Sequence, residues 1–341
     1  MLIFFKEFYK KFIEPQAIDS DCIVACGTKY WFKTAANGID LDGIGIDLDG
    51  IGIDAGGTLA KLTLDGNLFV GCSSGGSAHA ALFTMLIGLF HEYSPYELKY
   101  RELHCNEWSF LPSLVDFPHC ESETRVDNPI IFLNVLKEIQ REMKERRNRF
   151  SDVDAKDFNE YRRKCNGASA ENSATMPAKI IVIDHIENLF RLEQYTKTRG
   201  KNGDEIAKLN GTADKILDTM TNDEIKKYKD SILSALAKLM SAGAKYGYHF
   251  ILTSDDIQYC NSEFIKDHCE IIGLKGTSPW KSKEYLDNNL ATSIFGDKTK
   301  IAIKDKDKCK LYQVPYILEI GDEDGSFNDI KQKFKYLEKT L

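Results

Sequence analysis

The sequence predicts an α/β fold with a mainly parallel central sheet and flanking helices. Segments of strand character alternate with helical segments along the chain, the order expected when helices cover a parallel sheet. The 341 residues are 43% hydrophobic and 28% charged, which is ordinary for a globular protein. The chain is therefore expected to build a large core.

Residues 1–55 are expected to form an extension that precedes the α/β domain of residues 56–341. The opening MLIFFKEFYKKFIEP predicts an amphipathic helix that docks on the domain or on a partner. Its charges interrupt the apolar run that a signal peptide or membrane span requires, and residues 21–32 predict a strand. The nine cysteines are scattered and odd in number, which favours reduced thiols and a cytoplasmic location.

Residues 39–54 contain a seven-residue tandem repeat, IDLDGIG. Its alternation of apolar and acidic residues predicts a β-hairpin extension. A second interpretation is a calcium site with ligands from Asp40, Asp42, Asp47, Asp49 and Asp54, since carboxylates beside glycines suit this ion. No Glu stands at the twelfth position of an EF-hand, and the period is not that of calcium β-rolls. The hairpin is therefore the preferred interpretation.

The remaining elements follow in alternation. Strands are predicted at residues 68–72, 98–103, 178–184 and 248–254, and helices at 80–90, 130–150, 230–247 and 330–341. Residues 195 to about 230 are rich in Lys, Asp, Asn and Gly, which predicts a surface insertion. The lysines between 304 and 310 alternate with acids and predict an exposed hairpin.

The net charge and the spacing of the cysteines bear on two kinds of ligand, nucleic acid and structural zinc. The net charge of −7 argues against broad attraction to nucleic acid. The one dense basic run, residues 141–149, alternates with glutamates and predicts a solvated helix face, so DNA contact there is the minority alternative. Cys22 with Cys26, and His104-Cys105 with His119-Cys120, are metal candidates that lack the spacing of structural zinc sites.

The stretch FVGCSSGGSAHAALFTMLIGLF, residues 69–90, has the layout of a phosphate-binding loop between a strand and a helix. The Gly-Lys-Ser/Thr that would hold phosphate and Mg²⁺ is absent. A plain Gly/Ser turn is one alternative. A hydrolase with Ser73, Ser74 or Ser77 as nucleophile is another, but the Gly-x-Ser-x-Gly elbow is missing. Its base would be His79 or His185 with Asp184, and strand alternation predicts opposite faces for Asp184 and His185.

From about Gly56 to Ile317, several segments in order resemble the motor domain of the FtsK/SpoIIIE family. This family includes DNA-pumping ATPases and the EccC/EssC ATPases of type VII secretion. The matching segments are residues 64–100, 110–119, 135–164, 179–190 and 233–256. The resemblance implies a RecA-like P-loop NTPase fold, ring assembly, ATP and Mg²⁺ as ligands, and DNA or protein as substrate.

Under this resemblance the phosphate loop has lost its charge-handling side chains. Ala78 stands at the position of the Walker A Lys and His79 at that of the Ser/Thr. The degenerate nucleotide-binding loop comprises Cys72, Ser73, Ser74, Gly75, Gly76, Ser77, Ala78 and His79. His79 does not replace the Lys, because imidazole is shorter and largely neutral at pH 7.

The second half of the implied site shows the same loss. Asp184 keeps the Walker B carboxylate, but His185 stands where the family has its catalytic Glu. Asp255 and Asp256 replace the polar and cationic sensor residues, which places negative charge near the expected phosphates. Lys283 stands where the family tends to have an Arg that acts on a neighbouring subunit.

These replacements predict a catalytically inactive pseudo-ATPase, because phosphoryl transfer depends on positioning and electrostatics. The expected role is a scaffold or regulatory subunit in a DNA-translocation, conjugation or secretion system. Expected partners are copies of the same chain, an active FtsK/SpoIIIE-like ATPase, or other components of such a system, with DNA more weakly supported. The alternative is a divergent ATP-binding DNA or protein translocase subunit that is active only in a composite oligomeric site.

Overall fold

The computed structural model describes residues 46–47, 63–64, 66–73, 78–79, 82, 86, 89–90, 93–105, 114, 117–166, 176–192, 220–295, 300–306 and 308–313. Several predicted features lie outside these ranges. They are the N-terminal helix, the strand at 21–32, Cys22, Cys26, Asp40, Asp42, Asp49, Asp54 and the C-terminal helix.

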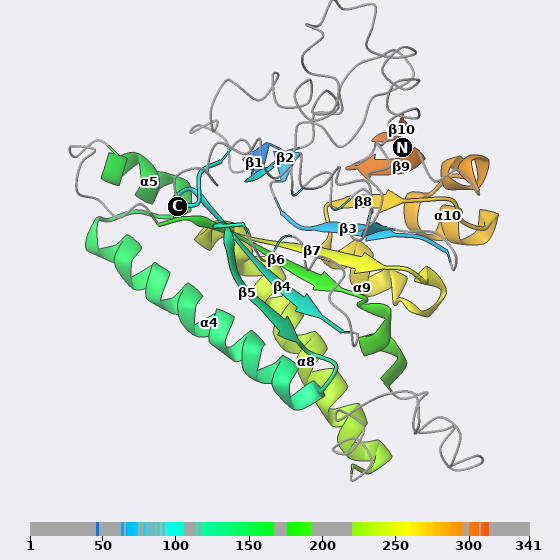
Figure 1. Cartoon of the computed structure of the whole chain (residues 1–341), viewed down its shortest axis with the longest axis horizontal. Coiled ribbons are helices and arrows are strands. Elements are labelled where there is room, and N and C mark those ends of the chain that lie inside the picture. Colours follow the sequence, from blue (N-terminus) through cyan, green and yellow to red (C-terminus); the bar gives the residue numbers. More distant parts are fainter. Residues whose placement is uncertain are drawn as a thin grey trace, which may run out of the picture.

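Within the described ranges, eight strands form one sheet in the order β10-β9-β8-β3-β7-β6-β4-β5. The strands are β3 (Leu68–Gly71), β4 (Leu98–His104), β5 (Cys120–Arg125), β6 (Ala178–Asp184), β7 (Tyr248–Ser254), β8 (Ile271–Leu274), β9 (Lys300–Asp305) and β10 (Lys308–Gln313). The six strands from β8 to β5 are parallel to one another, and β9 and β10 add an antiparallel hairpin at one edge (Figure 1). The predicted α/β fold and the hairpin around Lys304 are confirmed.

Both faces of the central strands β3, β6, β7 and β8 are buried, as is usual for a parallel sheet. Along β6, Ile180 and Val182 belong to a cluster that includes Leu82, Leu86 and Phe90 of the segment after β3. The alternate residues Ile181 and Ile183 belong to a second cluster with residues of the long helices α4 and α8. The described residues of segment 79–90 are helical, and several of them pack in the first cluster on one face of the sheet. The helices α4 and α8 cover the other face (Figure 1).

The helices begin where the sequence supplies caps. The helix α4 (Pro129–Asp152) starts at Asn128, whose side chain accepts a hydrogen bond from the amide of Ile130. The other α-helices are α5 (Phe158–Asn166), α8 (Asn222–Gly243), α9 (Ser262–His268) and α10 (Pro279–Leu286), and short 3₁₀ turns are η4 (Ala244–Tyr246), η5 (Ile257–Tyr259) and η6 (Leu290–Ile294). Residues 187–192 are also helical.

The start of α8 corrects the predicted insertion. The sequence analysis begins the helix near residue 230, whereas α8 begins at Asn222. Thr221 and Glu224 form a capping box, in which each side chain bonds the backbone amide of the other residue. Residues 222–230, which the sequence assigns to the insertion, therefore form the start of a helix.

The repeat contributes one described strand, β1 (Ile46–Asp47). It pairs antiparallel with β2 (Thr63–Leu64), outside the repeat, with Asp47 opposite Thr63. Extended structure at this point of the repeat is confirmed. In the described part of the chain, no helix is both long and apolar enough to cross a membrane.

Candidate functional site

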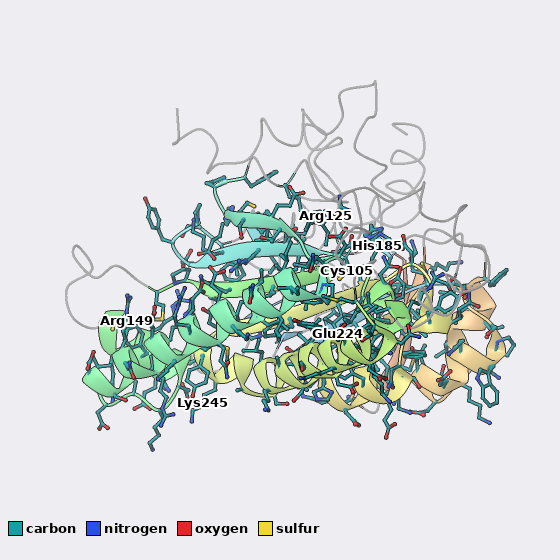
Figure 2. The ribbon with its side chains drawn as sticks, turned by 90° about the horizontal axis from the view of Figure 1, so that it is seen from below. Cys105, Arg125, Arg149, His185, Glu224 and Lys245 are labelled. Carbon is teal, nitrogen blue, oxygen red and sulfur yellow. The ribbon has the colours of Figure 1, made fainter. Side chains whose placement is uncertain are left out.

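The candidate site lies where four neighbouring parallel strands end. Gly71 of β3 pairs with Ser254 of β7, and His104 of β4 pairs with Asp184 of β6. The residues that follow these pairs therefore leave the same edge of the sheet, where open α/β sheets place their ligand sites. In Figure 2, Cys105 and His185, which follow β4 and β6, lie at this edge, whereas Arg149 and Lys245 mark the opposite end of the long helices.

His79 lies at the start of the helical segment and contacts two carboxylates. Its Nε2 lies 2.7 Å from Oδ1 of Asp184, and its Nδ1 lies 3.4 Å from Oδ2 of Asp255. The hydroxyl of Thr253 donates to the same Oδ1 of Asp184. The His79 and Asp184 side chains are only 3% and 1% exposed, so the pair is almost fully removed from water.

Asp255 follows β7 and reaches across to the loop after β3. Its Oδ1 accepts a hydrogen bond from the amide of Ala78 at 3.2 Å. The thiol of Cys72 lies 3.5 Å from the same oxygen, and burial together with the charge of Asp255 raises the pKa of that thiol. Asp255 is the accessible member of the group, since 31% of its side chain is exposed.

His185 departs from strand geometry. It follows the last residue of β6 with φ of 55°, a left-handed conformation in which His is enriched. Its Nε2 consequently lies 3.7 Å from Oδ2 of Asp184. The prediction that these two side chains point to opposite faces is wrong, because alternation applies inside a strand and not after it.

Glu187 is a site residue that the sequence analysis missed. Its Oε1 lies 2.9 Å from Nδ1 of His185, and the residue is 4% exposed. The available signal was an acid two residues after His185 in a segment that follows a buried strand. A buried carboxylate is normally paired, and this one fixes the orientation of the His185 ring through the hydrogen bond.

The charges of the site are mutually stabilising. Burial opposes the ionised forms, but the charge and hydrogen bond of His79, with help from His185 and Thr253, lower the pKa of Asp184 to about 2. Burial likewise disfavours the protonated form of His79. The negative charges of Asp184 and Asp255 have the larger effect, so the pKa of His79 is raised. Burial also lowers the pKa of His185, but the hydrogen bond to Glu187 and the nearby carboxylate charges have the larger effect. Together they raise the pKa of His185 to about 9.

The structure places the other predicted site residues as follows. Ser73 is half-buried and its hydroxyl lies 2.7 Å from that of Thr277. Asp256 accepts a hydrogen bond from the Gln258 amide and does not contact the His79 group. Lys283 is exposed on α10, and the residues Ser74, Gly75, Gly76 and Ser77 lie outside the described ranges.

The metal candidates His104-Cys105, at the end of β4, and His119-Cys120, at the start of β5, have different contacts. His104 lies 3.3 Å from Glu123, whereas His119 bonds the backbone oxygen of Tyr93 at 2.7 Å and stacks on Phe90. Burial raises the pKa of Cys105 well above its ordinary value, which disfavours the thiolate that a metal needs. These residues do not form a metal-ligand group. One such group does occur in the described part of the chain, comprising His79, His185 and Asp255.

Three solved structures share this fold. The conjugation coupling protein TcpA of pCW3, in its monomer form with ATPγS, matches with a TM-score of 0.56 and 16% identity over 81% of this chain and 67% of that chain. The cytoplasmic domain of the type VII secretion ATPase EccC from Thermomonospora curvata matches with 0.60 and 14% over 83% and 30%. ATPases 2 and 3 of EssC from Geobacillus thermodenitrificans match with 0.59 and 16% over 85% and 48%.

The extent of these matches differs. The chain spans about two thirds of the TcpA chain and less than half of the EccC and EssC chains. No protein-family model and no curated protein matches the sequence. The comparisons thus concern architecture, and they agree with the eight-stranded, mostly parallel sheet and its flanking helices. The chain has the RecA-like P-loop NTPase fold found in FtsK/SpoIIIE-like motor domains.

Proposed function

We propose that this chain is a non-hydrolysing, ATPase-like subunit that acts through subunit contacts in a translocation assembly of the conjugation or secretion type. The fold shared with TcpA, EccC and EssC supports the kind of assembly. One observation carries the proposed inactivity: His79 lies between Asp184 and Asp255 and contacts both.

The position where a phosphate would bind is already occupied by a carboxylate of the chain. Backbone amides at a helix N-terminus attract anions such as phosphate. The amide of Ala78, which precedes the helical segment, already donates to the carboxylate of Asp255. A phosphate at this position would have to displace an anion that the protein itself supplies, and it would meet no Lys side chain at residue 78.

The side chains at this edge of the sheet also bear on the binding of Mg²⁺. This ion prefers oxygen ligands in nearly octahedral geometry. Asp184 is the one Walker B-like carboxylate of the proposed site. Its Oδ1 is engaged by His79 and Thr253, and its Oδ2 faces the imidazole of His185 at 3.7 Å and not an open space lined by oxygen ligands. The residues that the structure describes at this edge therefore do not fit a Mg²⁺–triphosphate group, and no catalytic step through that group is proposed.

The surface of α10 supports a role in contacts. Trp280 on this helix is 78% exposed, and Lys283 is exposed one turn further along. Large aromatic side chains are enriched where proteins associate. In this proposal α10 faces a neighbouring subunit, either a second copy or an active ATPase of the same fold.

The proposal is tested by steady-state hydrolysis of Mg-ATP with the purified chain. We expect no turnover above the Asp184→Asn control, which reveals any contaminating ATPase. The triple variant Ala78→Lys, His79→Ser, His185→Glu is also expected to be inactive, because Asp255 still occupies the amide of residue 78 and repels phosphate.

Two outcomes would overturn the proposal. Turnover by the wild-type chain that Asp184→Asn abolishes would establish an enzyme. Turnover that arises only after addition of an active ATPase of the same fold, and that Lys283→Ala abolishes, would favour the composite-site alternative.

A further inference from the structure

Two imidazoles and a carboxylate converge at the carboxyl edge of the sheet. One ligand atom from each of His79, His185 and Asp255 lies within 4.8 Å of the others. The rings of His79 and His185 are 5.1 Å apart between centroids. These residues come from the segment after β3, the end of β6 and the end of β7, so the fold itself brings them together.

Each imidazole is held through one nitrogen by a buried carboxylate. Nε2 of His79 bonds Asp184, and Nδ1 of His185 bonds Glu187 at 2.9 Å. Histidines that bind metals usually donate their second N–H to a carboxylate or carbonyl, which fixes the ring and its tautomer. In this arrangement Nδ1 of His79 and Nε2 of His185 are the nitrogens directed to a shared ligand. Because their raised pKa values leave both rings protonated in the metal-free protein, a metal ion that binds these nitrogens displaces those protons into solvent.

A buried carboxylate oxygen provides an independent sign of a ligand. Oδ2 of Asp184 has no hydrogen-bond partner among the described residues, although the side chain is 1% exposed. This oxygen lies 3.7 Å from Nε2 of His185 and thus borders the same space. Leaving such an atom unpaired is costly, and a cation in this space would relieve that cost.

We infer that His79, His185 and Asp255 form a binding site for a divalent transition metal ion of the zinc class. Imidazole nitrogen and carboxylate oxygen are ligands that Zn²⁺ accepts, whereas Mg²⁺ and Ca²⁺ take oxygen ligands. Three protein ligands leave the fourth tetrahedral position for water or another ligand.

The distances require little rearrangement. Tetrahedral zinc with bonds of about 2.0 to 2.1 Å places its ligand atoms about 3.3 Å apart. Nδ1 of His79 and Oδ2 of Asp255 are already 3.4 Å apart. The ligand atom of His185 lies within 4.8 Å of the other two, so its side chain has to close a gap of up to about 1.5 Å.

This inference goes beyond the proposed function and does not depend on it. The metal would be bound without nucleotide, and its binding is measured without ATP. A chain that hydrolyses ATP could still bind zinc here, and a chain that fails to bind zinc could still be inactive.

The test is a titration of the full chain, stripped with a chelator and desalted, with Zn²⁺ by calorimetry. We expect one ion per chain. Asp255→Asn and His185→Gln should weaken binding by at least about tenfold, and Glu187→Gln by about 10- to 100-fold through the ring that it orients. Asp256→Asn is the matched control, since it removes a neighbouring carboxylate outside the ligand set, and it should leave affinity unchanged.

Titration with Co²⁺ then reports the ligand type. We expect visible absorption of a tetrahedral site without the charge-transfer band of a thiolate, although Cys72 lies close to Asp255. Any of three results would overturn the inference: no saturable zinc binding at about 100 μM, equal affinities of Asp255→Asn and Asp256→Asn, or a thiolate band. Asp255 is partly exposed, so this variant stays informative even if a buried His79 variant does not fold.

Discussion

At the scale of single residues, the site is governed by buried charges that satisfy one another. Removing one partner of a buried pair typically costs more than the pair contributes, because it leaves a charge in a low-dielectric environment. Asp184 has His79, His185 and Thr253 as partners. This dependence explains why the side chain at residue 79 matters as much as the acid that it contacts.

Two buried histidines away from the site, His119 and His249, are predicted to make the fold less stable at acid pH. Burial is the largest cause that lowers the pKa of His119 and of His249 to about 4, from 6.5. Between pH 4 and pH 6.5 the unfolded chain binds protons that the folded chain does not. The free energy of unfolding is therefore highest near pH 7 and falls as the pH drops from 6.5 toward 4. Each histidine can contribute up to about 3 kcal/mol to this loss.

Urea unfolding of His119→Phe and His249→Phe at pH 7 and pH 4.5 checks this expectation. The difference in unfolding free energy between the two pH values should be smaller by about 2 kcal/mol in each variant than in the wild type. The phenylalanine at 119 keeps the stack on Phe90. An unchanged pH difference in both variants would contradict the argument.

The sequence predicted part of the site for a clear physical reason. Residues that follow parallel strands meet at one edge, so the proximity of Cys72, Asp184 and Asp255 follows once the strands are recognised. The contacts among them did not follow. The left-handed turn at His185 reverses the direction that alternation predicts, and this turn also brings the ring to Glu187.

At the scale of elements, helix ends were harder to predict than helix bodies. The periodic segments 130–150 and 248–254 correspond closely to α4 and β7. The first turn of α8 is polar and was assigned to a loop, although Thr221 and Glu224 carry the spacing of a capping box. Polar composition therefore masked a helix start that only side-chain-to-backbone bonding explains.

The capping box yields an element-scale prediction. Thr221→Ala removes an acceptor for the amide of Glu224, and loss of such a cap typically costs about 1 kcal/mol. Ser241→Ala is the control, because this exposed serine bonds the backbone oxygen of Ala237 within the same helix and caps nothing. Equal unfolding free energies of the two variants in urea would show that the box does not stabilise α8.

At the scale of the whole molecule, strand order creates the site. The strands β3 and β6 are separated along the chain by the helical segment 79–90, β4, β5, α4 and α5, yet only β7 lies between them in the sheet. The alternation of elements predicted a parallel sheet but not this order, because the central strands β3, β6, β7 and β8 are all buried on both faces and are alike in this respect. Only the packed sheet shows that the ends of β3, β7 and β6 face a common space.

The proposed function distinguishes this chain from TcpA, with which it shares its fold. In TcpA the structure was determined with ATPγS, whereas here a carboxylate of the chain itself accepts from the amide of Ala78 and an imidazole contacts Asp184. We propose that these internal contacts take the place of nucleotide and Mg²⁺.

Calorimetric titration of the purified chain with Mg-ATP, with ADP as a second ligand, shows whether nucleotide can enter this site. We predict no heat of binding up to millimolar ATP. Saturable binding in the micromolar range, lost in Asp184→Asn, would contradict the claim, because it would mean that ATP displaces Asp255 and that Asp184 exchanges His79 for a metal ion.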